Sequence, residues 1–305
     1  MHEIRAEPIE NSWILLCENR SKRPLGTDDR CPFCPGREAM TPPEIFAIRE
    51  GPPDGPGWRI RVIPNKYPAV DLPDLKTPHE IVIETPDHNA DIPDYTAEHL
   101  RDLLLVFRDR LREMCSKKDV KYVQLFRNKG ARAGASIFHP HTQILALPFV
   151  PRRIKSELEF IREEGLDFER DGGTRTVAEC GNFIAFAPYF SRFPYEIWVA
   201  PRVKRPDFSK TEEGELLHLA LLLKKSVTAL KHILGEIPYN LILHTLKDRD
   251  FHWHFEILPR YEGLAGFEVA TGVYMNSKSP ERAASDLRAA IKEEFDERRD
   301  SQTSV

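Results

Sequence analysis

The chain has 305 residues, which at about 150 residues per domain allows one large domain or two small ones. Its 44 Lys and Arg and 48 Asp and Glu give a formal net charge of −4, so bulk charge does not favour nucleic acid as a partner. No apolar run approaches the roughly 18–20 residues of a membrane span, and residues 1–5 lack the apolar core of a secretory signal, so we expect neither a membrane segment nor secretion.

The cysteine content indicates a reducing environment. The chain has five cysteines, an odd number, and only Cys31 and Cys34 lie close together in the sequence. A framework of disulfides is therefore not expected, and a cytoplasmic location fits better. Cys17, Cys115 and Cys180 lie in apolar or helical surroundings and are expected to be small packing residues.

Hydrophobic periodicity in the first half predicts both strands and a helix. The expected strands are 58–63, 80–84, 122–126 and 138–145. A helix is expected to begin near Thr96, with Glu98 in its first turn. Its apolar side chains recur at helical spacing, at Leu100, Leu103, Leu104, Phe107, Leu111 and Met114.

The second half repeats this order of elements. Strands are expected at 183–187, 196–200, 239–244 and 251–255, with a helix at 211–234 between them. Landmarks recur at similar offsets, which are 116 residues from Ile81 to Ile197, 115 from Thr96 to Thr211, 117 from Tyr122 to Tyr239 and 113 from His139 to His252. Four such agreements favour a duplicated unit over a coincidence of common elements. We therefore predict two α+β halves, residues 1–155 and 156–305. The second half is expected to end with a helix that begins at Ser279-Pro280.

Cys31 and Cys34 form the chain's one Cys-x-x-Cys pair, which offers two thiolate ligands on a tight turn. Tetrahedral zinc needs two further ligands, and these must be His or carboxylate groups from elsewhere. Candidates are His88, just after an expected strand, and His139. A redox dithiol is the alternative, although prolines and a long loop follow the pair instead of the unit typical of a thioredoxin-like site.

His139 and His141 flank Pro140 in an expected strand, where residues i and i+2 point to the same face. One imidazole could hold a metal while the other acts as a nucleophile, and two structural histidines are the alternative. The preceding residues 128–136 are rich in Gly and Ala but lack the Gly-Lys-Ser/Thr ending of a Walker A loop. Beside the two histidines, this run is expected to bring backbone N–H groups close to a phosphate.

His244, His252 and His254 form a second cluster within eleven residues. On a strand, His252 and His254 would share a face, so the three imidazoles indicate a second metal site, with a purely structural role as the alternative. A carboxylate from Glu157 or Glu159 would complete such a site.

Taken together, these motifs resemble those of the galactose-1-phosphate uridylyltransferases, in the histidine-triad superfamily. The resemblance is carried by Cys31-Pro-Phe-Cys34, His88, Asn128-Lys-Gly, Ser136 and His139-Pro-His-Thr-Gln143. Phosphorylases of the ADP-glucose type look similar too. The resemblance implies two tandem histidine-triad-like halves, whose antiparallel sheets join into one half-barrel with helices packed outside. It also implies a homodimer with its active site near the subunit boundary.

The resemblance implies a role for each matching residue. Cys31, Cys34, His88 and His139 match structural zinc ligands, and His141 matches the nucleophile. Residues that match the phosphate site are Gln143, Ser136 and Asn128. Residues that match contacts to the nucleotide and the hexose are Arg20, Arg23, Asn65 and Glu268. Residues that match a second metal site, for zinc or iron, are Glu157, His244, His252 and His254. Among the departures, Lys66 stands where an Asp is usual and Thr142 where a Gly is usual.

The implied activity belongs to carbohydrate metabolism. A UMP group would be exchanged between UDP-glucose and galactose 1-phosphate, or another hexose 1-phosphate, through a covalent nucleotidyl-histidine with ping-pong kinetics. The partners would be a nucleotide sugar and a sugar 1-phosphate. Alternatives are an ADP- or UDP-sugar phosphorylase that uses inorganic phosphate, a nucleotide hydrolase of the same superfamily, and a non-catalytic zinc-containing nucleotide-binding protein.

Overall fold

The structure, a computed structural model, describes residues 2–18, 31–71, 77–165 and 173–303. Its strands are β1 (His2–Glu7), β2 (Ser12–Cys17), β3 (Phe46–Arg49), β4 (Trp58–Pro64), β5 (His79–Ile83), β6 (Tyr122–Lys129), β7 (His141–Leu147), β8 (Thr176–Cys180), β9 (Phe183–Phe186), β10 (Ile197–Pro201), β11 (Tyr239–His244) and β12 (His254–Pro259). Its α-helices are α1 (Ala97–Cys115), α2 (Arg152–Glu164), α3 (Glu213–Leu234), α4 (Gly266–Thr271) and α5 (Pro280–Thr303). Short 3₁₀ turns are η2 (Glu38–Met40), η3 (Ile92–Asp94), η4 (Ala131–Ala133) and η5 (Phe208–Lys210).

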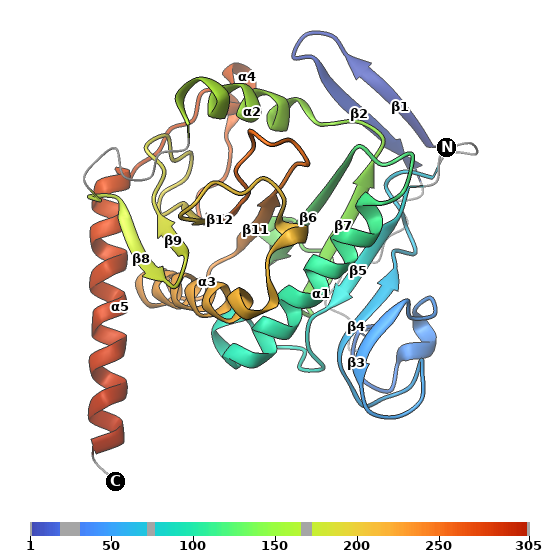
Figure 1. Ribbon diagram of the computed structural model, residues 1–305, viewed down its shortest axis with the longest axis horizontal. Coiled ribbons are helices and arrows are strands. Elements are labelled where there is room, and N and C mark those ends of the chain that lie inside the picture. Colours follow the sequence, from blue (N-terminus) through green and yellow to red (C-terminus); the bar gives the residue numbers. More distant parts are fainter. Residues whose placement is uncertain (1, 19–30, 72–76, 166–172, 304–305) are drawn as a thin grey trace.

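Ten of these strands form one antiparallel sheet, in the order β3-β4-β5-β7-β6-β11-β12-β10-β9-β8. β3 and β8 are its edges, so the sheet does not close into a barrel. Helices pack outside it, and the hairpin β1–β2 projects from one side (Figure 1). This is the α+β architecture expected from the sequence. No helix in the described ranges combines the length and apolar character needed to cross a membrane.

The strand order confirms the duplication. β6 and β11 pair at the centre, with Leu241 opposite Arg127, and the strands on either side follow in the same succession. On one side stand β7, β5 and β4, and on the other stand their counterparts β12, β10 and β9. α1 and α3, the main helix of each half, pack against each other on one side of this sheet (Figure 1).

Side-chain alternation explains which face of the sheet the helices cover. On β7, Thr142 and Ile144 are buried toward the helices, while His141 and Gln143 point to the opposite face, because successive strand residues alternate. The apolar positions predicted for α1 are all buried in this core. The Thr96 hydroxyl accepts a hydrogen bond from the His99 N–H at 3.1 Å, which confirms the predicted start of the helix.

The last helix also begins as predicted. The Ser279 carbonyl accepts a hydrogen bond from the N–H of Ala283 at 2.9 Å, and Pro280 occupies the first turn, where its missing N–H is not needed. The first part of α5 packs against α3 and β8, through Ala283, Ala284, Leu287 and Ala290. Figure 1 shows the rest of α5 extending beyond the body of the molecule.

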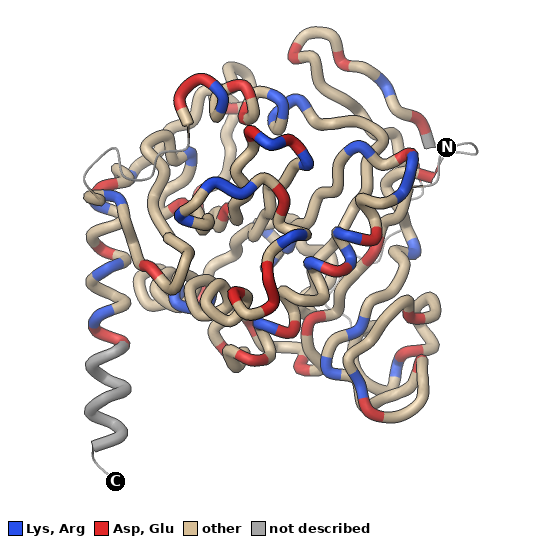
Figure 2. The backbone as a smooth tube through the Cα atoms, in the orientation of Figure 1, with Lys and Arg blue, Asp and Glu red and all other residues tan. Residues whose placement is uncertain are grey.

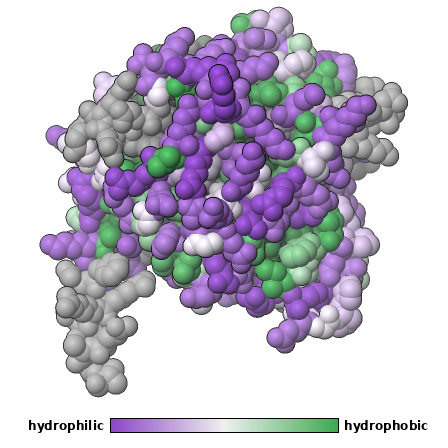
Figure 3. Space-filling model, viewed as in Figure 1, coloured by the Kyte–Doolittle hydropathy of each residue, from purple (hydrophilic) through white to green (hydrophobic). Residues whose placement is uncertain are grey.

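Charged residues of both signs are interspersed along the chain (Figure 2). The face drawn in Figure 3 is mostly hydrophilic, with apolar side chains scattered over it.

A buried polar cluster joins strands of both halves on the helix-covered side. Glu84, which follows β5, accepts hydrogen bonds from Nε of Arg127 at 2.9 Å and from the Thr142 hydroxyl at 2.7 Å. Arg127 also donates to the Tyr239 hydroxyl at 2.8 Å and lies 3.0 Å from Oδ1 of Asp91. All five side chains are buried. The cluster thus holds β7, which begins at His141, from the helix-covered face of the sheet. The hydrogen bond that the Thr142 hydroxyl donates to Glu84 explains the Thr at this position.

Replacing Glu84 with alanine is expected to lower the free energy of unfolding by about 3 kcal/mol. The reason is that the change leaves Arg127 buried with less countercharge and removes the acceptor for the Thr142 hydroxyl. Urea denaturation followed by circular dichroism measures the difference. The control is Glu163→Gln, which replaces an exposed carboxylate on α2 and should cost under about 0.5 kcal/mol. Equal stability of Glu84→Ala and the wild type would show that the cluster contributes nothing.

Candidate active site and metal centres

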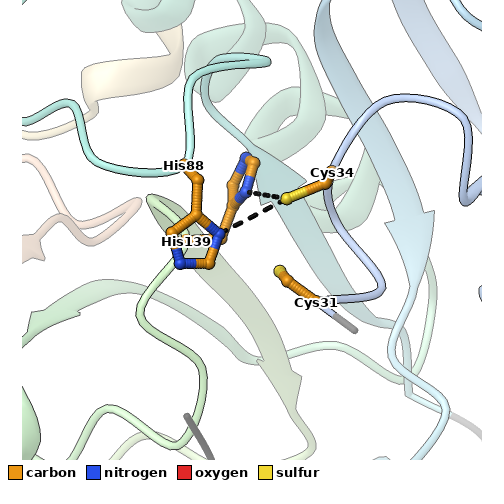
Figure 4. Close-up of side chains that lie close together, drawn as sticks. All are labelled: Cys31, Cys34, His88 and His139. Carbon is orange, nitrogen blue, oxygen red and sulfur yellow. Dashed lines mark hydrogen bonds between the residues drawn. The ribbon is translucent and has the colours of Figure 1, made fainter. Parts of the chain in front are cut away.

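The structure brings together Cys31, Cys34, His88 and His139, with one donor atom of each within 4.8 Å of all the others. Figure 4 shows that the two cysteines come from one turn and the histidines from two other loops. Sγ of Cys34 lies 3.4 Å from Nδ1 of His88 and 3.6 Å from Nδ1 of His139. The prediction that His88 and His139 join the cysteine pair therefore agrees with the geometry.

The ring of His139 has the tautomer that a metal ligand needs. Its Nε2–H donates to the Thr85 carbonyl at 2.7 Å, so Nδ1 presents its lone pair to the cysteines. Burial lowers the pKa of His139 to about 4, which keeps the ring neutral, and burial raises the pKa of the Cys31 thiol to about 11. Two sulfurs and two imidazole nitrogens form a donor set that fits a tetrahedral metal, whereas a redox dithiol has no need of the two histidines.

His141 is the first residue of β7, and His139 lies in the loop before it. The prediction that both share one strand face is therefore wrong. Pro140 lacks an N–H group and cannot donate to the ladder, and the last pair with β5 is His141 with Ile83. The two rings nevertheless meet a common neighbour, since Phe33 of the cysteine turn lies edge-on to His139 at 6.2 Å and to His141 at 5.4 Å between ring centroids.

The tautomer of His141 is also defined. Its Nδ1 lies 2.9 Å from the His139 carbonyl oxygen, to which only an N–H can donate, so in the neutral ring Nε2 carries the lone pair. Burial lowers the pKa of His141 below its usual value, which favours this neutral form at pH 7. A neutral imidazole with a free Nε2 can attack an electrophilic phosphorus atom.

Gln143 shares the face of His141, two residues along β7, and contacts a histidine that sequence reasoning missed. Its Oε1 lies 3.1 Å from Nε2 of His79, on β5. The same ring nitrogen lies 3.2 Å from Nδ2 of Asn65, which the sequence placed at the nucleoside. The structure thus joins Asn65, His79 and Gln143 in one contact series beside His141.

Asn128 also lies on this face, at the sheet centre. Its Oδ1 accepts a hydrogen bond from Nδ2 of Asn240 at 2.8 Å, across the β6–β11 pair. Asn240 holds the following turn as well, because it donates to the Ala133 carbonyl at 2.9 Å. Asn240 was not identified from the sequence, because a single Asn near the start of an expected strand does not indicate a functional site.

The Gly- and Ala-rich turn differs in part from expectation. The N–H groups of Ala133 and Ala135 both donate to the Gly130 carbonyl, and that of Gly134 donates to the turn as well, so these three do not face a phosphate. Gly130 has φ of +80°, and an added Cβ would lie 3.1 Å from the Pro238 ring, which explains the glycine. Ser136 follows, half-buried, three residues before His139.

One of the predicted substrate contacts, Glu268, lies apart from this group. Arg20 and Arg23 lie outside the described residues. Glu268, on α4, lines a separate pocket of about 280 Å³ together with Arg192 and Tyr274, and neither His141 nor Gln143 lines that pocket. Oε2 of Glu268 accepts a hydrogen bond from the Ala265 N–H at 3.0 Å.

A second group of donors lies in the second half. Glu157 on α2 approaches Nδ1 of His244 at 2.8 Å and Nε2 of His254 at 3.2 Å. Burial alone would raise the pKa of Glu157, but the two imidazoles outweigh it and the pKa lies below its usual value. Oε1 of Glu157 and Nε2 of His254 are buried without a hydrogen-bond partner among the described residues, and such a pair of donor atoms fits a metal ion.

His252 is not among the residues whose donor atoms gather in this group. β12 begins at His254, and Nε2 of His252 donates to the Pro201 carbonyl at 2.8 Å. His139 makes the same bond to Thr85, but it is joined by the cysteine pair and His88, which the second half lacks. Glu159 is exposed, and Glu157 supplies the carboxylate.

Comparison with known proteins gives the following similarities. A family model described as the N-terminal domain of a domain of unknown function (DUF4931) matches residues 18–150. ADP-glucose phosphorylase from Arabidopsis thaliana is 31% identical, over 94% of this chain and 92% of the relative. Galactose-1-phosphate uridylyltransferase from Thermotoga maritima is 30% identical, over 94% of this chain and 98% of the relative. A solved uridylyltransferase structure is 29% identical with a TM-score of 0.81, covering 96% of this chain and 99% of that one.

The two relatives and the solved structure are similar to nearly the whole chain, and the family model covers β7, which carries His141 and Gln143. Similarity of this extent at about 30% identity agrees with the fold. The chain belongs to the family of the galactose-1-phosphate uridylyltransferases and the ADP-glucose phosphorylase.

Proposed function

We propose that the chain is a UDP-glucose–hexose-1-phosphate uridylyltransferase, a transferase of galactose metabolism. The observation that carries this proposal is His141, whose Nδ1–H is held by the His139 carbonyl so that Nε2 is a free nucleophile. The family relationship to the Thermotoga maritima uridylyltransferase supports the substrate pair UDP-glucose and galactose 1-phosphate.

In the first half-reaction, Nε2 of His141 attacks the α-phosphorus of UDP-glucose. A nitrogen–phosphorus bond forms, the bond from the α-phosphorus to the bridging oxygen breaks, and glucose 1-phosphate leaves with that oxygen and its electron pair. In the second, a phosphate oxygen of galactose 1-phosphate attacks the same phosphorus and displaces Nε2 as a neutral imidazole. Donor and acceptor are chemically alike, so one pocket serves both steps with ping-pong kinetics.

The other residues would bind and orient the nucleotide sugar. Gln143 and Ser136 would donate hydrogen bonds to the non-bridging phosphate oxygens, where charge redistributes in the transition state. Asn128 would line the same site, held by Asn240. The contacts proposed for the nucleotide are Asn65, Arg20 and Arg23.

We assign zinc to Cys31, Cys34, His88 and His139, because two thiolates and two imidazoles suit this ion. With four protein ligands the zinc would be structural, and it would supply rigidity to the turn and the loop from which His141 is aimed. Glu157, His244 and His254 would hold a second ion, zinc or iron, of the kind bound by two histidines and a carboxylate.

The larger organisation is also proposed. The two halves would divide at residues 155 and 156, with the zinc site and the nucleophile in the first. The enzyme would be a cytoplasmic homodimer. Because Glu268 does not line the His141 site of its own chain, its proposed contact with the hexose would need a second copy of the chain.

A phosphorylase is the second candidate function, and the similarity to ADP-glucose phosphorylase over nearly the full length of both chains favours it. The nucleophile would be the same, but inorganic phosphate would attack the nucleotidyl-histidine and release a nucleoside diphosphate. Lys66 and Thr142, which depart from the uridylyltransferase pattern, leave the nucleophile and the metal ligands unchanged.

Product analysis separates the two functions. The purified protein is incubated with UDP-glucose and galactose 1-phosphate in one arm, and with ADP-glucose and inorganic phosphate in the other. We expect UDP-galactose and glucose 1-phosphate from the first arm, and at least about tenfold slower turnover in the second. ADP from the second arm without UDP-galactose from the first would reject the uridylyltransferase in favour of the phosphorylase. Free UMP alone would indicate a hydrolase.

A further inference from the structure

His79 lies on the same face of the sheet as His141 and Gln143. Gln143 stands opposite Ile81 in the β5–β7 pair, and His79 is two residues before Ile81, so the two side chains are diagonal neighbours. His79 is buried, 5% exposed, although imidazole is polar. The resemblance to the family gave this histidine no role, and its contacts must therefore explain its position.

The hydrogen bonds of His79 define its tautomer. The N–H of Ala69 donates to Nδ1 at 3.1 Å, and a backbone amide can only donate, so Nδ1 carries no proton. In the neutral ring the proton is then on Nε2. This N–H donates to Oε1 of Gln143 at 3.1 Å.

The amide of Asn65 lies beside the same ring nitrogen. Its Oδ1 accepts a hydrogen bond from the Tyr67 N–H at 2.8 Å, so its Nδ2 is the atom turned toward Nε2 of His79, at 3.2 Å. An amide nitrogen donates and cannot accept. With the proton on Nε2 this contact therefore joins two donors and is not a hydrogen bond, whereas the Gln143 oxygen can accept that proton.

The consequence concerns the direction of the Gln143 amide. A Gln side chain offers an acceptor on one side and two donors on the other, and rotation by 180° exchanges them. Because Oε1 is bound to His79, the NH₂ group is turned away from β5, and within the described ranges it donates to no protein group. The NH₂ group is thus available on the face that carries His141. The reversed amide would present its oxygen to a phosphate and repel it.

We propose that His79 is a positioning residue for nucleotidyl transfer, which holds the Gln143 amide with its N–H groups toward the phosphate that His141 attacks. The inference rests on the proposed function. It adds to that function the reason why the Gln143 N–H groups, which are donors of the phosphate site, point in one direction. His79 does not touch the phosphate. It acts through Gln143, and its effect therefore depends on the presence of Gln143.

The first test is the tautomer itself. In protein labelled with ¹⁵N-histidine, long-range nitrogen–proton spectra assign the proton of each ring, and His79 is identified by comparison with His79→Leu. We expect the proton on Nε2 between pH 7 and 8. A proton on Nδ1 would overturn the proposal, whatever the activity of the enzyme.

The second test is a double-mutant cycle on the rate of nucleotidyl-His141 formation from UDP-glucose in a single turnover. His79→Leu and Gln143→Ala are each expected to slow this step by about 10–100-fold. The double variant should be no slower than Gln143→Ala alone, because His79 acts through that side chain. His79→Gln, which keeps a donor near the position of Nε2, should recover the rate to within about fivefold of the wild type.

The control is His232→Leu, which removes a histidine from the outer surface of α3 and should change neither rate nor stability. Thermal unfolding and metal content are measured for every variant. If the wild type forms the adduct but the two single effects multiply in the double variant, His79 has only a structural role and the inference fails alone. If the wild type forms no adduct from any nucleotide sugar, the proposed function fails and takes the inference with it.

Discussion

The His141→Ala variant is expected to form no nucleotidyl adduct and to turn over at least about 10⁴-fold more slowly than the wild type. The reason is that Nε2 of His141 is the atom proposed to form the bond to phosphorus, and neither His79 nor His139 presents a lone pair in the same way. His79 has its proton on Nε2, and His139 turns its free nitrogen toward the cysteines. Intact-protein mass spectrometry after incubation with UDP-glucose, with peptide mapping of the adduct, measures the loss.

The same experiment reports on the alternatives. The metal content and thermal midpoint of His141→Ala should match the wild type, because this residue is not in either donor group. A uridylyl adduct mapped to any residue other than His141 in the wild type would contradict the assignment of the nucleophile. If wild type and variant bind UDP-glucose equally and neither forms an adduct, a non-catalytic nucleotide-binding protein becomes the better account.

Removal of the metal from the first half is expected to have the second large effect. Cys34→Ala should lower the bound zinc by one equivalent per chain and the free energy of unfolding by at least about 3 kcal/mol. Three segments that are distant in sequence meet at this site, and the ion would link them in place of packing contacts. Elemental analysis and thermal unfolding measure both changes.

The activity of Cys34→Ala is expected to fall as well, by about 10–100-fold. The His139 carbonyl orients His141, and Phe33 of the cysteine turn packs against both rings, so loosening the turn disturbs the aim of the nucleophile. The matched control is Cys180→Ala, which removes a cysteine from β8 that lies outside the donor groups. It should keep its metal and lose less than about 1 kcal/mol. Undiminished zinc in Cys34→Ala would reject the proposed ligand set.

The fold followed from sequence because its signals are local. Apolar spacing predicted α3 close to its observed bounds and the start of α1 near Thr96, which is the N-cap of that helix. The repeated order of elements predicted the duplication, and the sheet has the matching strand succession in both halves. Strand bounds were less accurate at the His-x-His motifs, since the pairing partner determines where a ladder begins.

The candidate site was predicted where the motif itself contains the chemistry. The cysteine pair, His139, His141 and Gln143 lie in two short segments whose residue types and spacing point to a metal and a nucleophile. His79 and Asn240 were missed, because each acts on a partner far along the chain, Gln143 in one case and Asn128 in the other. A single polar residue in an apolar strand has no spacing that would reveal such a partner.

The two His-x-His motifs show the same limit most clearly. In sequence the two motifs are alike. In both halves the first histidine donates Nε2–H to a carbonyl at or just beyond the end of a strand, that of Thr85 or of Pro201, and the second histidine donates Nδ1–H to the carbonyl of the first. In the first half the cysteine turn and His88 reach the first histidine, and the second histidine keeps its Nε2 free. In the second half, the described residues bring no cysteine pair to the first histidine, and Glu157 from α2 faces the second.

The sequence by itself thus determined the elements of this protein, their duplication and the residues able to carry its chemistry, because periodicity, caps and motif spacing depend on neighbours within a few residues. Only the tertiary structure decided the surroundings of each histidine, and it revealed His79, to which no role was assigned from the sequence. The tautomer and surroundings of a ring depend on carbonyls, amides and donor groups that the sheet brings together from distant parts of the chain. That is why identical motifs in the two halves acquire different environments.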